Sequence, residues 1–138
     1  LTFDEDDPGR FTPEAMNYYP LALTMKYIQR GSDIVGSKVE GLTDERGLPR
    51  VFVTAAVKGD DITLLWVNDA CAPAEVTLSG LPEGRRFYKR FVTSEHYDGI
   101  GLGGETALPD GSVITLPPRS ITVYTTYVYG GARPRAVK

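Results

Sequence analysis

Residues 51–68 read VFVTAAVKGDDITLLWVN, and this stretch decides the fold class. Every second residue from Val51 to Val57 is apolar, which is the period of a strand with one buried face. The Gly-Asp pair that follows is typical of a tight turn, and a second apolar run begins directly after it. The stretch therefore predicts two antiparallel strands, Val51–Lys58 and Asp61–Asn68, joined as a hairpin.

The second strand of this hairpin is apolar on both faces. Ile62, Leu64 and Trp66 face one way, whereas Leu65 and Val67 face the other. A strand of this kind lies in the middle of a sheet or is covered on its second side. We therefore expect either a central strand or a strand whose second face is covered.

Shorter segments of the same character continue on both sides of the hairpin. Glycine and proline, at 15 and 10 of 138 residues, are spread between the apolar runs as turn residues are. About seven or eight short strands separated by such turns are typical of an antiparallel β-sandwich, either immunoglobulin-like or jelly-roll-like. We expect the further strands at residues 33–40, 74–79, 85–93, 112–116 and 120–129, with a long glycine-rich loop at 94–111.

A helix is predicted before the strands, over residues 13–30. Pro20 interrupts it, because proline lacks the backbone N–H that a helix interior needs. After this proline, Leu21, Met25 and Ile28 recur at helical spacing and form one apolar stripe. An amphipathic helix needs a surface to cover its stripe, which is either the following sheet or a domain outside this sequence.

Composition and charge exclude several classes of protein. The formal charge of −3, from 15 basic and 18 acidic residues, argues against a nucleic-acid binder, and no apolar run reaches membrane-spanning length. Cys71 is the only cysteine, so no internal disulfide forms, and the single His96 excludes a metal site with several histidines. No cofactor is expected.

The sequence predicts no calcium site in the N-terminal segment. Residues 1–12 are expected to form a loop, and the acidic run Asp4–Asp7 lacks the alternating ligands and internal glycine of a calcium loop. No signal peptide is recognisable at Leu1. The sequence starts at Leu1 without a methionine, so we expect it to be a piece of a longer protein.

Three stretches carry a resemblance to a known group of enzymes. Residues 17–28 read NYYPLALTMKYI and lead into GSDIV, residues 91–95 read FVTSE, and residues 114–124 read ITLPPRSITVY. Together they resemble the C-terminal end of clan A retaining glycoside hydrolases, (β/α)₈-barrel enzymes that include families 30 and 39. In that group the last barrel helix leads into a C-terminal β-sandwich.

The resemblance implies a domain organisation and a partner. Residues 1–31 would be a loop and helix at the tail of a preceding barrel, residues 32–129 the β-sandwich, and residues 130–138 a flexible tail. The implied role is that of an accessory sandwich, which stabilises the catalytic barrel of the same protein and contributes a loop to polysaccharide or oligosaccharide binding. The location of the parent protein stays open, with secretion or export to the periplasm compatible with the resemblance.

The resemblance transfers no catalytic residue to this chain. The catalytic pair of the clan is two glutamates at the ends of barrel strands four and seven, one acting as general acid/base and the other as nucleophile. The glutamates here lie on a helix start, on strands or in loops, at Glu14, Glu40, Glu45, Glu75, Glu83, Glu95 and Glu105. Many clan members borrow a strand from before the barrel. If this protein does so, a free sheet edge is available for homodimer pairing.

Candidate sugar-binding residues lie in the predicted 94–111 loop. Sugars need exposed aromatic faces beside polar groups, and His96, Tyr97 and Asp98 supply both in a glycine-rich segment. A surface loop without a ligand is the alternative interpretation. Trp66 is a further candidate, although its phase with Ile62 favours packing in the core.

Two other functions remain open at this point. An autonomous carbohydrate-binding module would bind glycans without a neighbouring barrel. An immunoglobulin-like structural or adhesive domain would bind a protein partner and no glycan. The coding sequence before Leu1 separates these hypotheses from the accessory domain, because only the accessory domain requires a barrel there.

Overall fold

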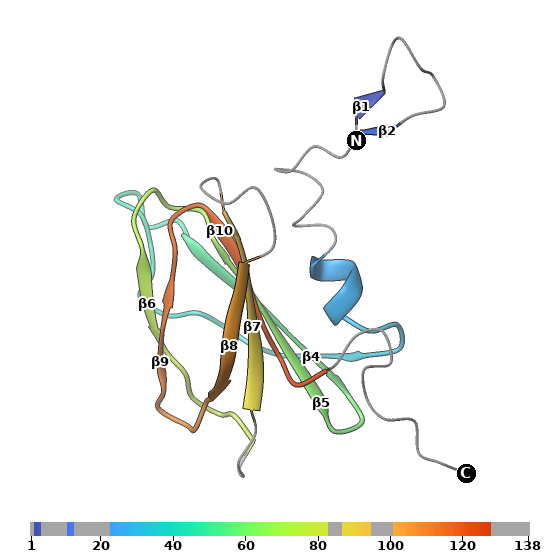
Figure 1. The fold of residues 1–138 in the computed structure, drawn as a ribbon. Coiled ribbons are helices and arrows are strands. Elements are labelled where there is room, and N and C mark those ends of the chain that lie inside the picture. Colours follow the sequence, from blue (N-terminus) through green and yellow to red (C-terminus); the bar gives the residue numbers. More distant parts are fainter. Residues whose placement is uncertain (1, 4–10, 13–22, 83–86, 95–100, 128–138) are drawn as a thin grey trace, which may run out of the picture.

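The chain is mainly antiparallel β structure, in the two-layer arrangement that the sequence predicts. A computed structural model describes residues 2–3, 11–12, 23–82, 87–94 and 101–127. Within these residues a six-stranded sheet, in the order β3-β4-β5-β10-β7-β8, faces a two-stranded sheet formed by β6 and β9 (Figure 1). The predicted antiparallel β-sandwich is confirmed. In the part of the chain so described, no helix is both long and apolar enough to cross a bilayer.

The hairpin that decides the fold class forms as predicted. Strand β4 spans Val51–Lys58 and β5 spans Asp61–Asn68, paired in antiparallel register from Val51 opposite Asn68 to Lys58 opposite Asp61. Gly59 has a φ of 58°, in the left-handed region that the tight turn requires and that glycine adopts at little cost.

The remaining strands of the large sheet flank this hairpin. Strand β3 (Asp33–Val35) pairs with β4 and ends well before the predicted residue 40. On the other side, β10 (Ser120–Thr125) lies between β5 and β7 (Phe87–Ser94), antiparallel to both. Strand β10 ends at Thr125, shorter than the predicted 120–129.

Two segments predicted as loops contain strands. Strand β8 (Gly101–Ala107) pairs antiparallel with β7, with a register shift between Lys89 and Arg90. Its sequence has no apolar alternation, so the pairing comes from the backbone and not from a buried face. Strands β1 (Thr2–Phe3) and β2 (Phe11–Thr12) also pair within the predicted 1–12 loop. The acidic run between them lies outside the described residues.

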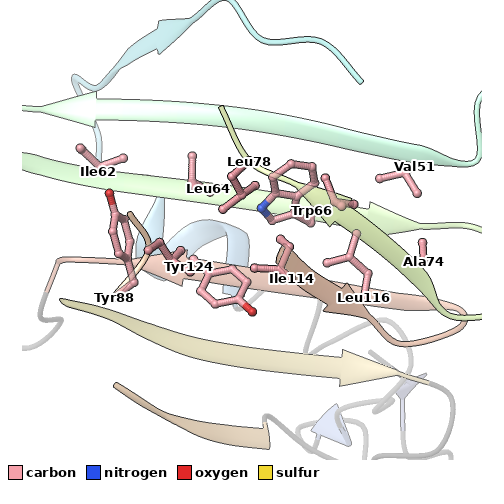
Figure 2. Packing of buried hydrophobic residues seen from close by; sticks show 12 residues of the cluster. Val51, Ile62, Leu64, Trp66, Ala74, Leu78, Tyr88, Ile114, Leu116 and Tyr124 are labelled. Carbon is pink, nitrogen blue, oxygen red and sulfur yellow. The ribbon is translucent and has the colours of Figure 1, made fainter. Parts of the chain in front are cut away.

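The small sheet covers the inner face of the large one and encloses the core. Strand β6 (Ala74–Thr77) pairs with β9 (Val113–Leu116), and their alternate residues point inward. The inward side chains of both layers meet around Trp66, as Figure 2 shows. The buried cluster consists of Val51, Ile62, Leu64, Trp66, Ala74, Val76, Leu78, Tyr88, Leu108, Ile114, Leu116 and Tyr124.

One buried amide ties the layers together at the end where β5 stops. Asn68 is 1% exposed, and its Nδ2 donates to the carbonyl oxygens of Ala72, Leu116 and Pro117 at 3.0, 3.3 and 3.0 Å. Its Oδ1 accepts from the backbone N–H of Ala70 at 3.1 Å. A single side chain thus satisfies backbone groups of the β5–β6 connection and of the β9–β10 turn.

Candidate functional site

The outer face of the large sheet carries the short helix at residues 23–27. Figure 1 shows this helix on the side of the sheet away from β6 and β9. Leu23, which is fully buried, packs with Phe91 and Val123 in a second apolar cluster, and Leu65 and Tyr27 pack against it. The expected cover on the second side of β5 is therefore this helix.

The helix is fixed to the sheet by stacking and by hydrogen bonds. The Tyr27 ring stacks on Phe91 with centroids 4.5 Å apart and planes inclined by 20°. Thr63 Oγ1 donates to the Tyr27 carbonyl oxygen at 2.8 Å, and Lys58 Nζ donates to the Arg30 carbonyl oxygen at 2.7 Å. Apolar and polar contacts thus hold the helix and the turn after it on the sheet.

The predicted apolar stripe of the helix is wrong at Met25. Its side chain is 74% exposed, whereas Leu23 and Tyr27, also four residues apart, face the sheet. Both residue pairs satisfy helical periodicity, so spacing alone does not select the buried face. The face that docks is the one that brings an aromatic ring onto Phe91. Leu21 lies outside the described residues.

Apolar side chains remain exposed on the helix and on the face of the sheet that carries it. Met25 is 74% exposed, Ile34 on β3 is 63% exposed, and Phe52 on β4 is 49% exposed. Ile34 pairs with Ala56 and Phe52 pairs with Val67, and these positions alternate in phase with the outer-facing Leu65. We call the surface formed by the helix together with Ile34 and Phe52 the helix-bearing face.

Of the four predicted sugar-binding residues, only Trp66 lies within the described part of the chain. Trp66 is 6% exposed and lies in the core between the layers (Figure 2), so its ring offers no face on which a sugar can stack. Its Nε1 has no hydrogen-bond partner in the described part of the chain. His96, Tyr97 and Asp98 lie outside the described residues, and their role stays a prediction.

The segment that contains these three residues connects at a defined end of the sheet. Ser94 ends β7 and pairs with Ser120, which in turn pairs with Asn68. Residues 95–100 therefore link β7 to β8 at the end where β5 stops and β10 begins.

Solved structures of glycoside hydrolases share this fold. A family 30 endoxylanase from Clostridium papyrosolvens C71 matches with a TM-score of 0.58 and 18% identity, over 71% of this chain and 24% of that chain. The family 30 subfamily 8 xylanase Xyn30A from Clostridium acetobutylicum matches at 0.57 and 15% identity, over 72% and 24%. The catalytic domain of family 30 xylanase C from Talaromyces cellulolyticus matches at 0.56 and 19%, over 72% and 21%.

These neighbours confirm the resemblance at the level of the fold. The chain spans about a quarter of the length of the two clostridial xylanases, so it corresponds to one part of such an enzyme. No protein-family model matches the chain, and no curated protein matches it. The solved structures that share this fold include these family 30 glycoside hydrolases, and the likeness to them is one of fold.

Proposed function

We propose that this chain is the accessory C-terminal β-sandwich of a retaining glycoside hydrolase and stabilises the catalytic (β/α)₈ barrel of that enzyme. One observation supports this proposal above the others. Met25 on the helix, and Ile34 and Phe52 on the same outer face of the sheet, are exposed apolar side chains beside the apolar cluster that the helix covers. Exposed apolar residues grouped in this way mark a surface that another body covers.

The helix-bearing face suits contact between domains of one chain. Interfaces of this kind bury roughly 600–1,500 Å² and are more polar than obligate interfaces between subunits. A face with three exposed apolar side chains and a helix as its centre fits that class. Each large apolar side chain fully buried there would contribute about 1.5–3 kcal/mol.

The chemistry of the enzyme lies in the barrel under this proposal. The two catalytic glutamates come from barrel strands, and none is assigned to this chain. The substrate is a polysaccharide or oligosaccharide, and the sandwich adds His96, Tyr97 and Asp98 to its binding. These residues follow Ser94, the last residue of β7, and segments that connect strand ends often carry binding residues, which supports a role as a binding loop.

The first experiment is to determine the coding sequence upstream of Leu1 and to purify the complete product. The expected result is a (β/α)₈ barrel with glutamates at the ends of its fourth and seventh strands, active on a polysaccharide. A start codon immediately before Leu1 would contradict the proposal.

The second experiment tests the face with a matched pair of variants. Ile34→Ser alters the helix-bearing face, whereas Val113→Ser alters an equally exposed β-branched residue on β9 of the other layer, at 62% against 63% exposure. In the complete enzyme we expect Ile34→Ser to lower stability by about 1–2 kcal/mol and Val113→Ser to leave it nearly unchanged. In the 138-residue chain both changes should have small effects. Equal effects of the two variants in the complete enzyme would contradict a barrel on this face.

A further inference from the structure

One apolar row of the outer face lies beyond the short helix. Phe52 on β4, Val67 on β5 and Ile121 on β10 lie opposite one another in the strand register. Strand alternation places them on the same face as the next row, which contains Leu65 and Val123 and is covered by the helix. Phe52 is 49% exposed, and Val67 and Ile121 are half-buried. We call these three residues the apolar row, which extends the helix-bearing face toward the end where β5 stops.

The helix runs along the sheet away from the apolar row. Leu23, its first described residue, packs with Val123, which lies opposite Leu65. Further along, the Tyr27 carbonyl oxygen accepts a hydrogen bond from Thr63. The contacts thus move along β5 away from the strand end that carries the apolar row, so the N-terminal end of the helix points toward this row. Figure 1 shows β1 and β2, the first described elements of the chain, beyond that end of the helix.

An arginine lies at the rim of the apolar row. The Arg50 carbonyl oxygen accepts from the backbone N–H of Asp69 at 2.9 Å, which continues the β4–β5 register one residue beyond the strands. The side chain of Arg50 is half-buried, and its Nε is buried without a hydrogen-bond partner in the described part of the chain. The carboxylate of Asp69 pairs with Arg119 at 3.5 Å, and none of the described carboxylates pairs with Arg50.

The apolar row and Arg50 together have the make-up of a protein interface. Interfaces combine an apolar centre with a polar rim, and aromatic and arginine side chains contribute most to their stability. A partner surface fits here when it covers the row with apolar side chains and brings a carboxylate to the rim. A guanidinium holds a carboxylate in a bidentate pair, which gives both strength and orientation.

We propose that the domain preceding this sandwich in the same polypeptide docks on the apolar row and places an acidic side chain on Arg50. The N-terminal end of the helix points toward the row, so a preceding domain is tethered beside it at a high effective concentration. A tethered domain docks stably through a smaller surface than a separate partner needs. The inference rests on the proposed function for the identity of that domain as a barrel, whereas the place of docking is argued from the sandwich alone.

The test is thiol labelling of the complete protein with a maleimide. Phe52→Cys and Phe87→Cys place thiols at two exposed aromatic positions, 49% and 60% exposed, at opposite ends of the large sheet. Mass spectrometry of the labelled peptides gives the rate at each position in the native protein, relative to its rate in urea. We expect position 52 to react at least tenfold more slowly than position 87. Equal relative rates at the two positions overturn the proposal.

A second pair of variants tests the role of the arginine. Arg50→Gln, made together with Phe52→Cys, should raise the labelling rate at position 52 at least threefold, because the interface loses its charged pair. Arg46→Gln alters an arginine with 81% of its side chain exposed and should leave that rate unchanged. An unchanged rate in the Arg50 variant overturns the pairing of Arg50 with an acidic side chain.

Dilution and the upstream coding sequence separate the remaining outcomes. Protection of position 52 that disappears on dilution would assign the apolar row to a second copy of the protein and would overturn the proposal. A preceding domain other than a barrel would contradict the proposed function, and protection of position 52 would still support docking at the row. A barrel with position 52 unprotected would overturn docking at the row and would leave the proposed function in place.

Discussion

At the scale of single residues, buried polar groups divide into those that are satisfied and those that are not. Asn68 belongs to the first class, with three carbonyl acceptors and one backbone donor. Thr122, fully buried on β10, belongs to the second, because its Oγ1 has no partner within the described residues. The two classes respond oppositely to isosteric substitution, since a lost hydrogen bond costs stability and a removed orphan hydroxyl does not.

Asn68→Asp replaces an amide donor by a carboxylate that faces three carbonyl oxygens. We expect a loss of about 2–4 kcal/mol in the free energy of unfolding at pH 7, because three donations become repulsions in a buried site. Part of this loss should be regained at low pH, where the new carboxyl group is protonated and can donate. Urea unfolding at several pH values measures both effects.

The reverse change at the next residue is the control for this prediction. The Asp69 side chain is 68% exposed and pairs with Arg119 at 3.5 Å. Asp69→Asn should therefore change stability by less than about 0.5 kcal/mol. A comparable loss in both variants would show that the strand end, and not the Asn68 hydrogen bonds, is sensitive.

Thr122→Val and Thr63→Val form a second matched pair. Thr63 Oγ1 contacts Thr125 Oγ1 and the Tyr27 carbonyl oxygen, both at 2.8 Å, whereas Thr122 Oγ1 has no described partner. We expect Thr122→Val to be neutral or stabilising by up to about 1 kcal/mol, and Thr63→Val to destabilise by about 1–2 kcal/mol. Thermal unfolding of the two proteins gives the comparison, and a destabilised Thr122→Val would mean that its hydroxyl has a partner.

At the scale of elements, the short helix depends on the sheet for its stability. A helix of one or two turns does not form alone in water, so its docking residues hold it in place. Leu23 and Tyr27 make those contacts, and Phe91 and Val123 receive them. Loss of the docking residues would expose the centre of the outer face.

Tyr27→Ala should lower the free energy of unfolding by about 2–4 kcal/mol, because it removes the stacked ring from Phe91. Met25→Ala on the same helix is the control, and it should stay within about 0.5 kcal/mol because Met25 is 74% exposed. Chemical denaturation of both variants is the measurement. Equal losses would indicate that helix propensity, and not docking, sets the cost.

Elements were predictable where a local pattern determined them. The hairpin of β4 and β5 has alternating apolar residues and a Gly-Asp turn, and both strands have the predicted bounds. Strand β8 has neither, since its glycine-rich sequence pairs only because β7 offers its edge. The pairing of Arg90 with Tyr124 was equally hidden, because it depends on the register between two strands whose starts, Phe87 of β7 and Ser120 of β10, lie 33 residues apart in the sequence.

At the scale of the whole molecule, the last strand of the sandwich closes the large sheet. The other strands of this sheet form two separate groups, β3-β4-β5 and β7-β8, and among the described strands β10 alone pairs with both. No local pattern in the sequence predicts this strand order, because the sequence of one strand does not identify the strands with which it pairs. It follows only from the packing of the two layers.

A chain that ends at Arg119 should not fold. It lacks β10, so the two groups have no shared strand, and the buried Val123 and Tyr124 are lost from both clusters. We expect no cooperative thermal transition for this chain, measured by circular dichroism. A chain that ends at Tyr129 retains every described strand and should unfold like the 138-residue chain. A cooperative transition in the shorter chain would show that the two groups pair without β10.

The central place of β10 has a consequence for biosynthesis. A ribosome delivers the chain from its N-terminal end, and a domain folds as a unit once its parts are available. The edges of β5 and β7 that pair with β10 therefore stay unpaired until almost the entire sandwich has been translated. Nascent chains of this protein are for that reason exposed to aggregation and to chaperone capture until β10 has been made, and the sandwich folds only after this strand has left the exit tunnel.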